Sequence, residues 1–509
     1  MHYDDVIVGA GTCGSVLAAR LTEDPARSVL LIEAGPDYPT LAETPADLLY
    51  GQVSLLDHDW AWQAQVDAER SIHYPRGKVT GGSSAVNGTI ALRGDPADFA
   101  EWAARGLPEW TWDQARPFYC RAEDDPQGVA LDPDAHRAGG PFPIARPTPA
   151  AWQPFHAAFH AACIGAGFAD CPDLNAAGAS GVGPFPRNKR DGVRMSTALT
   201  YLAGARSRPN LEIRPNVLVD TVVCDRGRAV AVDAIVDGRR ERVEADRITL
   251  AAGAVASPPI LLRSGIGPAT QLASLGVRVV APLPVGEVLL DHPSAGLPGV
   301  PVVGLTHDDD VVTEVGLRYT AAGSPDPNDM QLCLATMFDP EQMRGFMPDP
   351  VAMFMVGAVL MRPRSTGRLT ITSTDPAVPP RLELGYLAEP FDVARMIEAW
   401  RLGAELCRRP ELAHLVSSLL IDDATLAEDD ALEVVLRSQV TTTYHPAGTA
   451  PMGPDGDGRA VVDGHGRVYG IDGLRVVDAS IMPTSVRNNT NLTCVMLAER
   501  IAGWMAAGD

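Results

Sequence analysis

Three glycines near the start of the chain have the spacing of a phosphate-binding turn. Gly9, Gly11 and Gly14 form a Gly-x-Gly-x-x-Gly pattern, and Glu33 follows about 20 residues after the third glycine. The first glycine permits a tight bend, the second lets the backbone approach a pyrophosphate, and the third packs a helix against a strand. A carboxylate at this separation accepts hydrogen bonds from a ribose and disfavours a 2′-phosphate. These residue types predict a dinucleotide site.

The residues around the glycines predict the elements that would position such a site. Val6–Val8 is a short β-branched run, Ser15–Leu21 is typical of a helix, and Ser28–Ile32 is typical of a second buried strand. A strand, glycine turn, helix and strand in this order favour dinucleotide binding over an ordinary glycine turn, because the start of the helix offers free N–H groups to phosphates. The pattern alone leaves both NAD and FAD open.

A second group of side chains could bind a metal but is better explained by packing. His156, His160 and Cys163 lie at i, i+4 and i+7, so they would share one helix face, where they could bind zinc. Aromatic residues and alanines surround them, and the sequence offers no second ligand cluster. We therefore predict a packed helix face and no metal site. The acidic segment His307–Asp310 is typical of a solvated loop.

Composition limits the possible function classes. The chain has 509 residues, 46% of them hydrophobic and 21% charged, which is typical of a globular protein of about three domain-sized units. No stretch approaches the ~20 apolar residues that a membrane span needs. The net charge of −22 and the lack of a basic stripe argue against nucleic acid and anionic membranes as partners. Eight scattered cysteines and a start without a basic leader segment predict a cytoplasmic protein.

Two further segments carry a resemblance to a known family. Gly77–Ile90 and Gly253–Gly267 resemble the two signatures of the glucose–methanol–choline (GMC) family of FAD-dependent oxidoreductases. The first segment departs from the family pattern at Thr80, where the family prefers an aliphatic residue. The resemblance covers essentially the whole chain and implies that the cofactor is FAD. Other segments that resemble family landmarks, in family order, are Arg194–Ala198, Asp291–Pro293 and Gly473–Ser480.

The resemblance implies a cofactor site that is spread along the chain. The glycine turn around Gly82 can reach phosphate or flavin edge atoms, and Asp478 would hold the ribityl–pyrophosphate end. Val219 would meet the adenine, although an ordinary sheet strand is the alternative there. Val86 occupies the position from which some members tether the flavin through a histidine, so we expect FAD to bind without a covalent bond. The predicted cofactor residues are Gly9, Gly11, Thr12, Cys13, Gly14, Glu33, Ala34, Gly77, Thr80, Gly82, Ser83, Asn87, Gly88, Thr89, Val219, Asp478, Ala479, Asn489 and Thr490.

The resemblance also implies a catalytic pair, His445 and Asn489. The segments Thr443–Thr449 and Arg487–Thr493 are similar to the two active-site segments of the family, in the His–Asn version of its choline-oxidising branch. Alcohol oxidation moves a hydride to flavin N5 and removes the hydroxyl proton. A neutral imidazole, which titrates near pH 6.5, can take that proton, and an amide can stabilise the alkoxide-like oxygen. A buried structural histidine is the alternative interpretation of His445.

The substrate is only partly constrained by the sequence. Choline-oxidising relatives place a glutamate after Asp-His-Pro, but Ser294 stands here, so choline is not expected. Primary alcohols, polyols, amino sugars and aromatic carbinols stay open, with oxygen or another acceptor reoxidising the flavin. A biosynthetic dehydrogenase acting on a sugar or amino-sugar hydroxyl is the alternative. A flavin-containing lyase and a catalytically silent FAD-binding protein represent other classes, and the oligomeric state is not predicted.

The predicted fold is α/β, with a Rossmann-like FAD-binding domain interleaved with a substrate domain built on an antiparallel sheet flanked by helices. Residues 1–150, 190–300 and 440–509 would form the first domain, and residues 151–190 and 300–440 the second. By resemblance, the second domain's sheet covers the isoalloxazine ring. Its predicted elements are strands at Asp329–Leu334, Gly367–Thr372 and Arg381–Leu384, and a helix at Asp392–Arg408.

Overall fold

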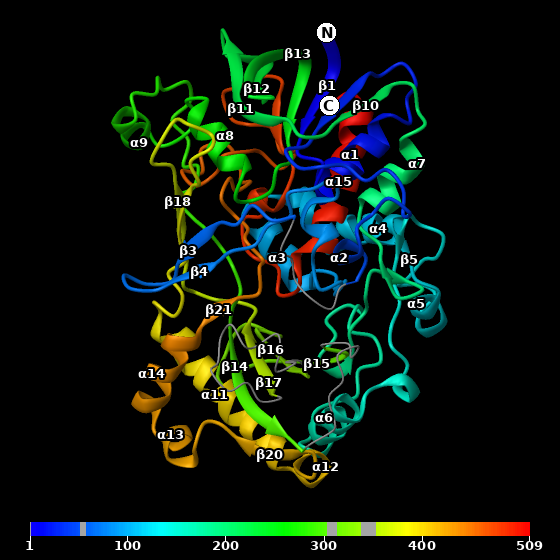
Figure 1. The fold of residues 1–509 in the computed structure, drawn as a ribbon, viewed down its shortest axis with the longest axis vertical. Coiled ribbons are helices and arrows are strands. Elements are labelled where there is room, and N and C mark those ends of the chain that lie inside the picture. Colours follow the sequence, from blue (N-terminus) through cyan, green and yellow to red (C-terminus); the bar gives the residue numbers. More distant parts are fainter. Residues whose placement is uncertain (1, 51–57, 303–312, 337–352) are drawn as a thin grey trace.

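Two large sheets organise the molecule. The computed structural model describes residues 2–50, 58–302, 313–336 and 353–509, and its two seven-stranded sheets lie one above the other in Figure 1. The predicted acidic loop at 307–310 lies outside the described residues. Within the described ranges, no helix is both long enough and apolar enough to cross a bilayer.

The first sheet is built around the N-terminal strand β1 (His2–Val8). It pairs in parallel with β2 (Val29–Ile32) on one side and with β13 (Arg239–Leu250) on the other, so its second half, Asp5–Val8, is buried. Such burial on both faces explains the β-branched run that predicted the strand. The other strands of this sheet are β10 (Leu211–Arg214) beside β2, then β12 (Arg228–Val236) and β11 (Leu218–Asp225) beyond β13, and β22 (Leu474–Val476) paired with β13.

The β–α–β unit predicted from the glycine pattern is present. Helix α1 (Thr12–Leu21) connects β1 to β2 and begins three residues before the predicted start at Ser15. It packs along the C-terminal helix α15 (Thr490–Ala506), and Arg20 Nη2 lies 2.7 Å from the buried Glu499 Oε1. The start of the chain and its last helix therefore form one body, as Figure 1 shows, with both termini at the same end.

The second large sheet is antiparallel, as expected for the substrate domain. Helices α11 (Pro390–Arg408) and α6 (Pro154–Gly165) pack on it, and Trp400 Nε1 of α11 donates a hydrogen bond to Ala295 O. The helix predicted at Asp392–Arg408 is thus confirmed. The two-domain division itself stays a prediction. The strand order is β20 (Val416–Leu419), β14 (Pro293–Pro301), β17 (Phe354–Leu360), β16 (Met330–Ala335), β15 (Val315–Tyr319) and β7 (Gly181–Pro184), with β21 (Thr441–Thr442) paired to β14.

Two predicted strands belong to a different sheet from the one expected. β18 (Arg368–Thr370) and β19 (Arg381–Glu383) were expected in the sheet that covers the flavin, but they form a separate four-stranded sheet with β3 (Gln63–Gln65) and β4 (Ser71–His73). The expectation is wrong because β19 pairs with a strand about 300 residues earlier in the chain. Local sequence patterns predict a strand but do not identify so distant a partner.

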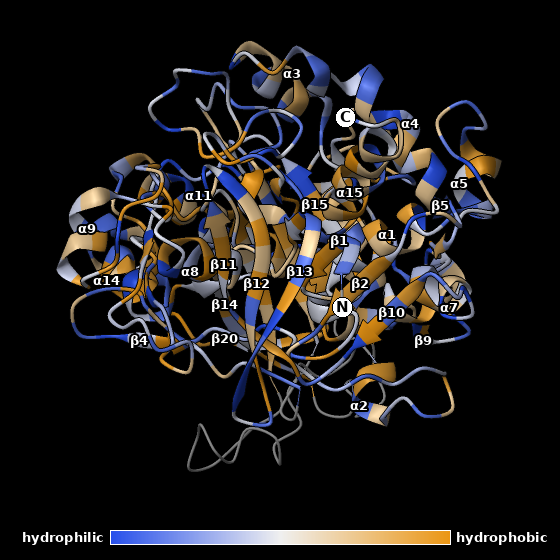
Figure 2. Ribbon diagram, turned by 90° about the horizontal axis from the view of Figure 1, so that it is seen from above, coloured by the Kyte–Doolittle hydropathy of each residue, from blue (hydrophilic) through white to orange (hydrophobic). Residues whose placement is uncertain are grey.

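The predicted packed face of α6 is also confirmed. His156 and Cys163 are fully buried, His156 Nε2 lies 3.2 Å from Leu334 O, and His160 Nε2 lies 2.9 Å from Asp170 Oδ1. These side chains are used for packing and hydrogen bonding. Figure 2 shows the corresponding distribution across the described residues, with hydrophobic segments concentrated in α1, α15 and the neighbouring strands β2 and β10, and hydrophilic segments in many of the outer loops.

The remaining elements are short or peripheral. They are α2 (Ala46–Leu49), α3 (Pro96–Ala104), α4 (Trp112–Ala122), α5 (Pro126–Leu131), α7 (Ala203–Ala205), α8 (Ser257–Arg263), α9 (Ala269–Ser274), α12 (Pro410–Ala413), α13 (Asp423–Ala427), α14 (Asp429–Gln439), the strands β5 (Glu123–Asp124), β6 (Phe142–Pro143), β8 (Lys189–Arg190) and β9 (Val193–Arg194), and single turns at Gly82–Ala85, Pro108–Trp110, Pro149–Ala151, Ala198–Leu202 and Ala479–Ile481.

Candidate active site

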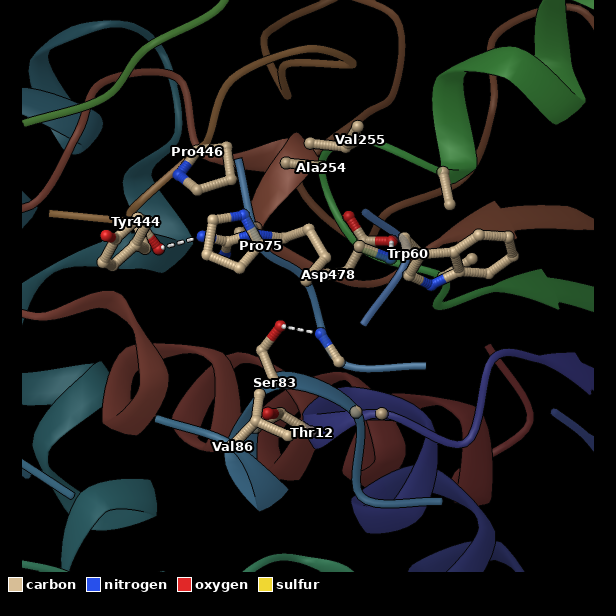
Figure 3. A pocket seen from close by; sticks show the side chains of 18 of the residues that line it. Thr12, Trp60, Pro75, Ser83, Val86, Ala254, Val255, Tyr444, Pro446 and Asp478 are labelled. Atoms are coloured by element: carbon tan, nitrogen blue, oxygen red, sulfur yellow. Dashed lines mark hydrogen bonds between the residues drawn. The ribbon is translucent and has the colours of Figure 1, made fainter. Parts of the chain in front are cut away.

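A cavity of about 860 Å³ is lined by residues of both large sheets. This volume lies within the ~300–1,000 Å³ that is usual for sites of small molecules and cofactors. In Figure 3, Thr12, Ser83 and Val86 line one side of the cavity, and Tyr444, Pro446 and Ala254 line the opposite side. The predicted site residues that line it are Gly9, Gly11, Thr12, Cys13, Glu33, Ala34, Gly77, Gly82, Ser83, Asn87, Gly88, Thr89, Val219, His445, Asp478, Ala479, Asn489 and Thr490.

Two predicted residues, Gly14 and Thr80, do not line the cavity. Gly14 lies against the preceding turn, where an added Cβ would come within 1.9 Å of Gly9 O. Gly11, in contrast, faces open space, since a Cβ added there would meet no atom closer than the Cα of Gly82 at 3.8 Å. This contrast matches the separate roles predicted for the glycines, close packing at Gly14 and room for a ligand at Gly11. Thr80 is buried, and its N–H donates to Pro36 O.

The two carboxylates that line the cavity are held by neighbouring donors. Glu33 Oε2 accepts a hydrogen bond from Ala10 N at 3.0 Å and Oε1 accepts one from Gly35 N at 2.9 Å, while burial raises the pKa of Glu33 to about 7. Asp478 accepts four hydrogen bonds, two at each oxygen, so its side chain is already saturated. Asp478 therefore anchors the loop around it, and Glu33 keeps lone pairs available for a ribose hydroxyl.

The beginning of α15 exposes unsatisfied polar groups to the cavity. Asn489 is the N-cap residue and makes no side-chain cap, so the first N–H groups of the helix keep no capping partner from it. Asn489 Oδ1 and Asn491 Nδ2 are buried without a hydrogen-bond partner, although Asn491 Oδ1 accepts a bond from Thr12 Oγ1 at 2.9 Å. Buried polar atoms without partners are rare. These two unpartnered atoms and the open space at Gly11 fit a cofactor that carries hydrogen-bonding groups, such as FAD.

A single carboxylate fixes the backbone around His445. Asp291 Oδ1 accepts a hydrogen bond from the backbone N–H of His445 at 2.9 Å, and Oδ2 accepts the hydroxyls of Tyr74, Tyr386 and Thr442 at 2.6, 2.5 and 2.6 Å. This arrangement ties the β21 segment to two distant parts of the chain. The imidazole ring of His445 is thereby placed on a rigid support.

Both nitrogens of the His445 ring have partners. Nε2 lies 3.1 Å from Asn489 Nδ2, and Nδ1 lies 2.9 Å from His292 Nδ1 and 3.0 Å from Thr443 Oγ1. The second histidine continues the series, because His292 Nε2 lies 2.8 Å from Ser485 Oγ. Asn489, His445, His292 and Ser485 thus form a hydrogen-bonded chain that begins at the cavity wall.

Burial keeps both histidines uncharged. It lowers the pKa of His292 to about 4 and moves the pKa of His445 well below its usual range, with the neighbouring His292 and Arg76 acting in the same direction on His445. At neutral pH each imidazole therefore has one protonated nitrogen and one free lone pair. A free lone pair of this kind can accept a proton from a bound molecule.

The sequence predicted His445 and Asn489, which both line the cavity, but gave no sign of the residues that support them. The segment Asp291–Pro293 was noted only as a landmark, and Ser485 carried no signal at all. The convergence of three hydroxyls on Asp291 depends on residues far apart in the sequence, so no local pattern could have shown it.

Within the described ranges, one further group of possible metal ligands occurs, Glu123, Asp125 and His136. Arginines already occupy it, since Arg93 Nη2 binds Glu123 and Arg146 Nη1 binds Asp125 at 2.6 Å. The cluster is therefore a buried charge network.

Comparison with known proteins agrees with the geometry. Two family models, both described as GMC oxidoreductase, match residues 3–294 and 363–498. An uncharacterised GMC-type oxidoreductase of Rhodococcus erythropolis is 36% identical over 518 residues, which cover 100% of this chain and 99% of that protein. Oxygen-dependent choline dehydrogenase 1 of Chromohalobacter salexigens is 35% identical over 550 residues, which cover 100% of this chain and 95% of that protein.

Solved structures show the same architecture. Pyridoxine 4-oxidase from Mesorbium loti has a TM-score of 0.90 at 29% identity and covers 99% of each chain. A formate oxidase variant of Aspergillus oryzae has a TM-score of 0.91 at 24% identity, covering 100% of this chain and 98% of the other, and supports the fold.

Proposed function

This chain belongs to the GMC oxidoreductase family and is an FAD-dependent enzyme that oxidises alcohols, and we propose that His445 is the base of that reaction. FAD, when bound, would supply the hydride acceptor for alcohol oxidation. The residues of this chain must then orient the alcohol, take its hydroxyl proton and stabilise the negative charge that develops on its oxygen. The observation that carries the proposal is the hydrogen-bonded chain from Asn489 to Ser485 at the cavity wall.

The hydrogen-bond pattern supports Nε2 as the basic atom of His445. The Asn489 amide nitrogen is a donor, so Nε2 must be an acceptor and the ring hydrogen sits on Nδ1. That hydrogen is donated to His292 Nδ1, which leaves the hydrogen of His292 on Nε2 to be donated to Ser485 Oγ. His292 is thus a positioning residue that holds His445 in the tautomer whose free lone pair faces the cavity.

Asn489 is proposed to contact the reacting oxygen. In the described arrangement its amide N–H donates to His445 Nε2, and a bound alcohol would replace that contact, its oxygen accepting from the amide and its hydroxyl donating to Nε2. A donor aimed at a developing oxyanion commonly contributes ~10²–10³-fold to the rate. Asn489 and His445 would then act together, one on the charge and the other on the proton.

The cofactor contacts are proposed from the same cavity. Gly9, Gly11 and the start of α1 would bind the pyrophosphate, Glu33 a ribose hydroxyl, and Val219 the adenine. The flavin would lie between the start of α15 and the segment Val86–Thr89. Other predicted cofactor residues at the cavity are Thr12, Cys13, Ala34, Gly77, Gly82, Ser83, Asp478, Ala479 and Thr490.

We expect the flavin to be released when the protein unfolds. Val86 lines the cavity at the position where some family members carry a tethering histidine, and a valine side chain cannot form such a bond. After acid precipitation of the holoenzyme, the yellow colour should stay in the supernatant. Colour that remains in the washed precipitate would contradict non-covalent binding.

The base assignment is tested by replacing the imidazole. His445→Ala should slow anaerobic flavin reduction by ~10²–10⁴-fold, the usual contribution of a general base, while FAD stays bound. The substrate for this assay is the compound that bleaches the flavin of the parent enzyme fastest, chosen from a panel of primary alcohols, sugars, amino sugars and aromatic carbinols. His414→Ala is the matched control, because that histidine is exposed. A His445→Ala enzyme that reduces its flavin at the parent rate would overturn the assignment, and a parent flavin that no alcohol bleaches would favour the lyase alternative.

The location and the electron acceptor are also proposals. All eight cysteines, each within the described ranges, are free thiols, which supports the predicted cytoplasmic location. Oxygen or another acceptor would reoxidise the flavin, and admitting air to the bleached enzyme distinguishes the two.

A further inference from the structure

Two cations line the cavity beside the second sheet, Arg187 and Lys189. They follow β7, and the segment between them is fixed by backbone hydrogen bonds from Arg187 N to Ala145 O at 2.8 Å and from Asn188 N to Thr89 O at 2.9 Å. Arg187 is only 8% exposed. The fold therefore places a guanidinium inside the cavity wall at a defined position.

The guanidinium of Arg187 is only partly used by the protein. Its Nη1 donates to Gly88 O at 3.1 Å and to Thr89 Oγ1 at 3.2 Å, but Nε and Nη2 are buried and have no hydrogen-bond partner. Nε and Nη2 form one edge of the guanidinium, and their two N–H groups are parallel. This edge matches the two oxygens of a carboxylate.

Within the described part of the chain, no carboxylate forms an ion pair with either cation, although the charge of Glu314 acts on Arg187 from beyond contact distance. The nearby Glu314 is engaged elsewhere, since its Oε2 lies 2.9 Å from His156 Nδ1 and accepts a hydrogen bond from Gln153 N. Burial lowers the pKa of Arg187 to about 10 and, together with the charge of Arg187, lowers that of Lys189 to about 8. An unpaired buried cation is costly, so an arrangement of this kind points to a missing anion.

The phosphates of the cofactor are not suited to be that anion. The open glycine turn at Gly9–Gly11 lies at the end of β1 in the first sheet, whereas Arg187 follows a strand of the second sheet. Arg187 also differs from Arg263, another arginine of the cavity wall, which is already paired with a carboxylate because its Nε donates to Asp220 Oδ1 at 2.9 Å. Gln331 of β16, also buried in the cavity wall, has a side-chain oxygen without a partner. The second-sheet side of the cavity thus offers both a positive charge and a free amide.

We propose that Arg187 and Lys189 bind a carboxylate of the substrate, so that the alcohol this enzyme oxidises is a hydroxylated carboxylic acid. The inference rests on the proposed function for the hydroxyl end of the molecule. The carboxylate accepts two hydrogen bonds from Nε and Nη2 of Arg187, and Lys189 adds a second positive charge. Gln331 accepts a hydrogen bond from a further donor of the substrate.

Binding can be tested without turnover. The FAD-loaded enzyme is titrated with benzoate and butanoate, and with the corresponding amides, while the visible flavin spectrum is followed. The carboxylates should bind at least tenfold more tightly than the amides. Arg187→Leu should weaken carboxylate binding by at least ~30-fold. This factor is the lower end of the range observed when one partner of a buried charge pair is removed. Lys189→Met should weaken it less, because Lys189 is only partly buried.

The control variant is Arg190→Leu, whose exposed side chain reaches the surface residue Asp124 and does not line the cavity. It should leave the binding of all four compounds unchanged. Amides that bind the parent enzyme as tightly as the carboxylates would overturn the proposal. Loss of FAD from both Arg187→Leu and Lys189→Met, read from the flavin absorbance per protein, would also overturn it, since the cations would then serve the cofactor.

A turnover experiment separates this inference from the proposed function. The alcohols are 4-(hydroxymethyl)benzoate and its methyl ester, and 6-hydroxyhexanoate and its methyl ester. The acids should reduce the flavin with a higher kcat/KM than the esters, and Arg187→Leu should remove that preference chiefly through KM. Faster reduction by the esters in the parent enzyme contradicts the carboxylate proposal and leaves alcohol oxidation intact. Tight carboxylate binding without bleaching by any alcohol contradicts alcohol oxidation and leaves the anion site intact.

Discussion

His445 and His292 form a pair of imidazoles that burial keeps uncharged, and His292 lowers the pKa of His445 further. The contact between their Nδ1 atoms is 2.9 Å, and two protonated imidazoles at that distance in a buried site would repel each other strongly. A base with a lowered pKa gives up some proton affinity but stays unprotonated over a wider pH range. His445 is therefore a weaker base than an exposed histidine, but it is unprotonated, and so able to accept a proton, over a wider pH range.

The pH dependence of flavin reduction should show this lowered pKa. A depressed folded-state pKa means that the basic form persists as the pH falls, and activity is lost only when the pH passes down through that value. We expect the acidic limb of the anaerobic reduction rate to lie below pH 6.5, the ordinary value for histidine. A limb at or above pH 6.5 would contradict a buried, desolvated base.

Replacing His292 tests its positioning role. His292→Phe removes one of the two partners of His445 Nδ1, leaving only Thr443 Oγ1, and removes one cause of the lowered pKa of His445. The reduction rate should fall by no more than the ~10²–10⁴-fold contribution of the base, and the acidic limb should move to higher pH. His292→Asn, whose amide oxygen can accept the same hydrogen, should recover part of the rate. A limb that stays in place in both variants would indicate a merely structural residue.

At the scale of single residues, the sequence predicted the residues at the cavity wall better than the residues behind them. The glycine pattern, His445 and Asn489 are short motifs whose chemistry is contained in their own residue types. Their supports are not, because Asp291 gathers its three hydroxyl donors from positions 74, 386 and 442. Arg187 was missed for the same reason, since a buried unpaired cation is indistinguishable in sequence from a paired one.

At the scale of elements, the contact between α1 and the turn before it decides the shape of the glycine cradle. Gly14→Ala should destabilise the protein by about 1–3 kcal/mol, as overpacking usually does, because its Cβ would lie 1.9 Å from Gly9 O. It should also weaken FAD binding, measured by thermal unfolding with and without added FAD. Gly503→Ala in α15 is the matched control, since nothing lies within 4 Å of its added Cβ. That variant should be stabilised by up to ~1 kcal/mol, and equal effects of the two substitutions would contradict the packing argument.

Prediction of elements succeeded where the pattern is local. The β–α–β unit and the helix α11 follow from apolar periodicity, and the structure extends their bounds by only a few residues. The pairing of β19 with β3 could not be predicted in this way, because two three-residue strands carry too little pattern to specify a register or a partner. Small sheets of this kind are determined by the rest of the fold.

At the scale of the whole molecule, a buried charge network joins segments between residues 93 and 173. It contains the carboxylates of Glu123, Asp125 and Asp173, opposed by Arg93, Arg146 and His136. The charges balance only when His136 is protonated. Arg93 also connects the network to the active site, because its carbonyl oxygen accepts a hydrogen bond from Asn488 Nδ2 at 2.6 Å.

Stability should therefore depend on the charge of His136. Although burial acts to lower it, the hydrogen bonds to Asp173 and Glu123 raise the pKa of His136 to about 8. A raised pKa stabilises the fold fully below the unfolded value, ~6.5, and the stabilisation is lost as the pH rises through about 8. The Tm should fall between pH 6.5 and 9, and His136→Gln should start lower and show a smaller fall. Parallel curves for the two proteins would contradict the network.

The distance along the chain between the two walls of the cavity has a consequence for biosynthesis. Thr12 at the start of α1 meets Asn491 at the start of α15, so the proposed flavin site is complete only after the residues up to the start of α15 have been synthesised. At ~5–20 residues per second, the ribosome needs roughly 25–100 s to connect these segments. We therefore expect a nascent chain not to retain FAD and newly made molecules to begin as apoprotein. Flavin supply in the cell would then limit how much of the newly made enzyme matures.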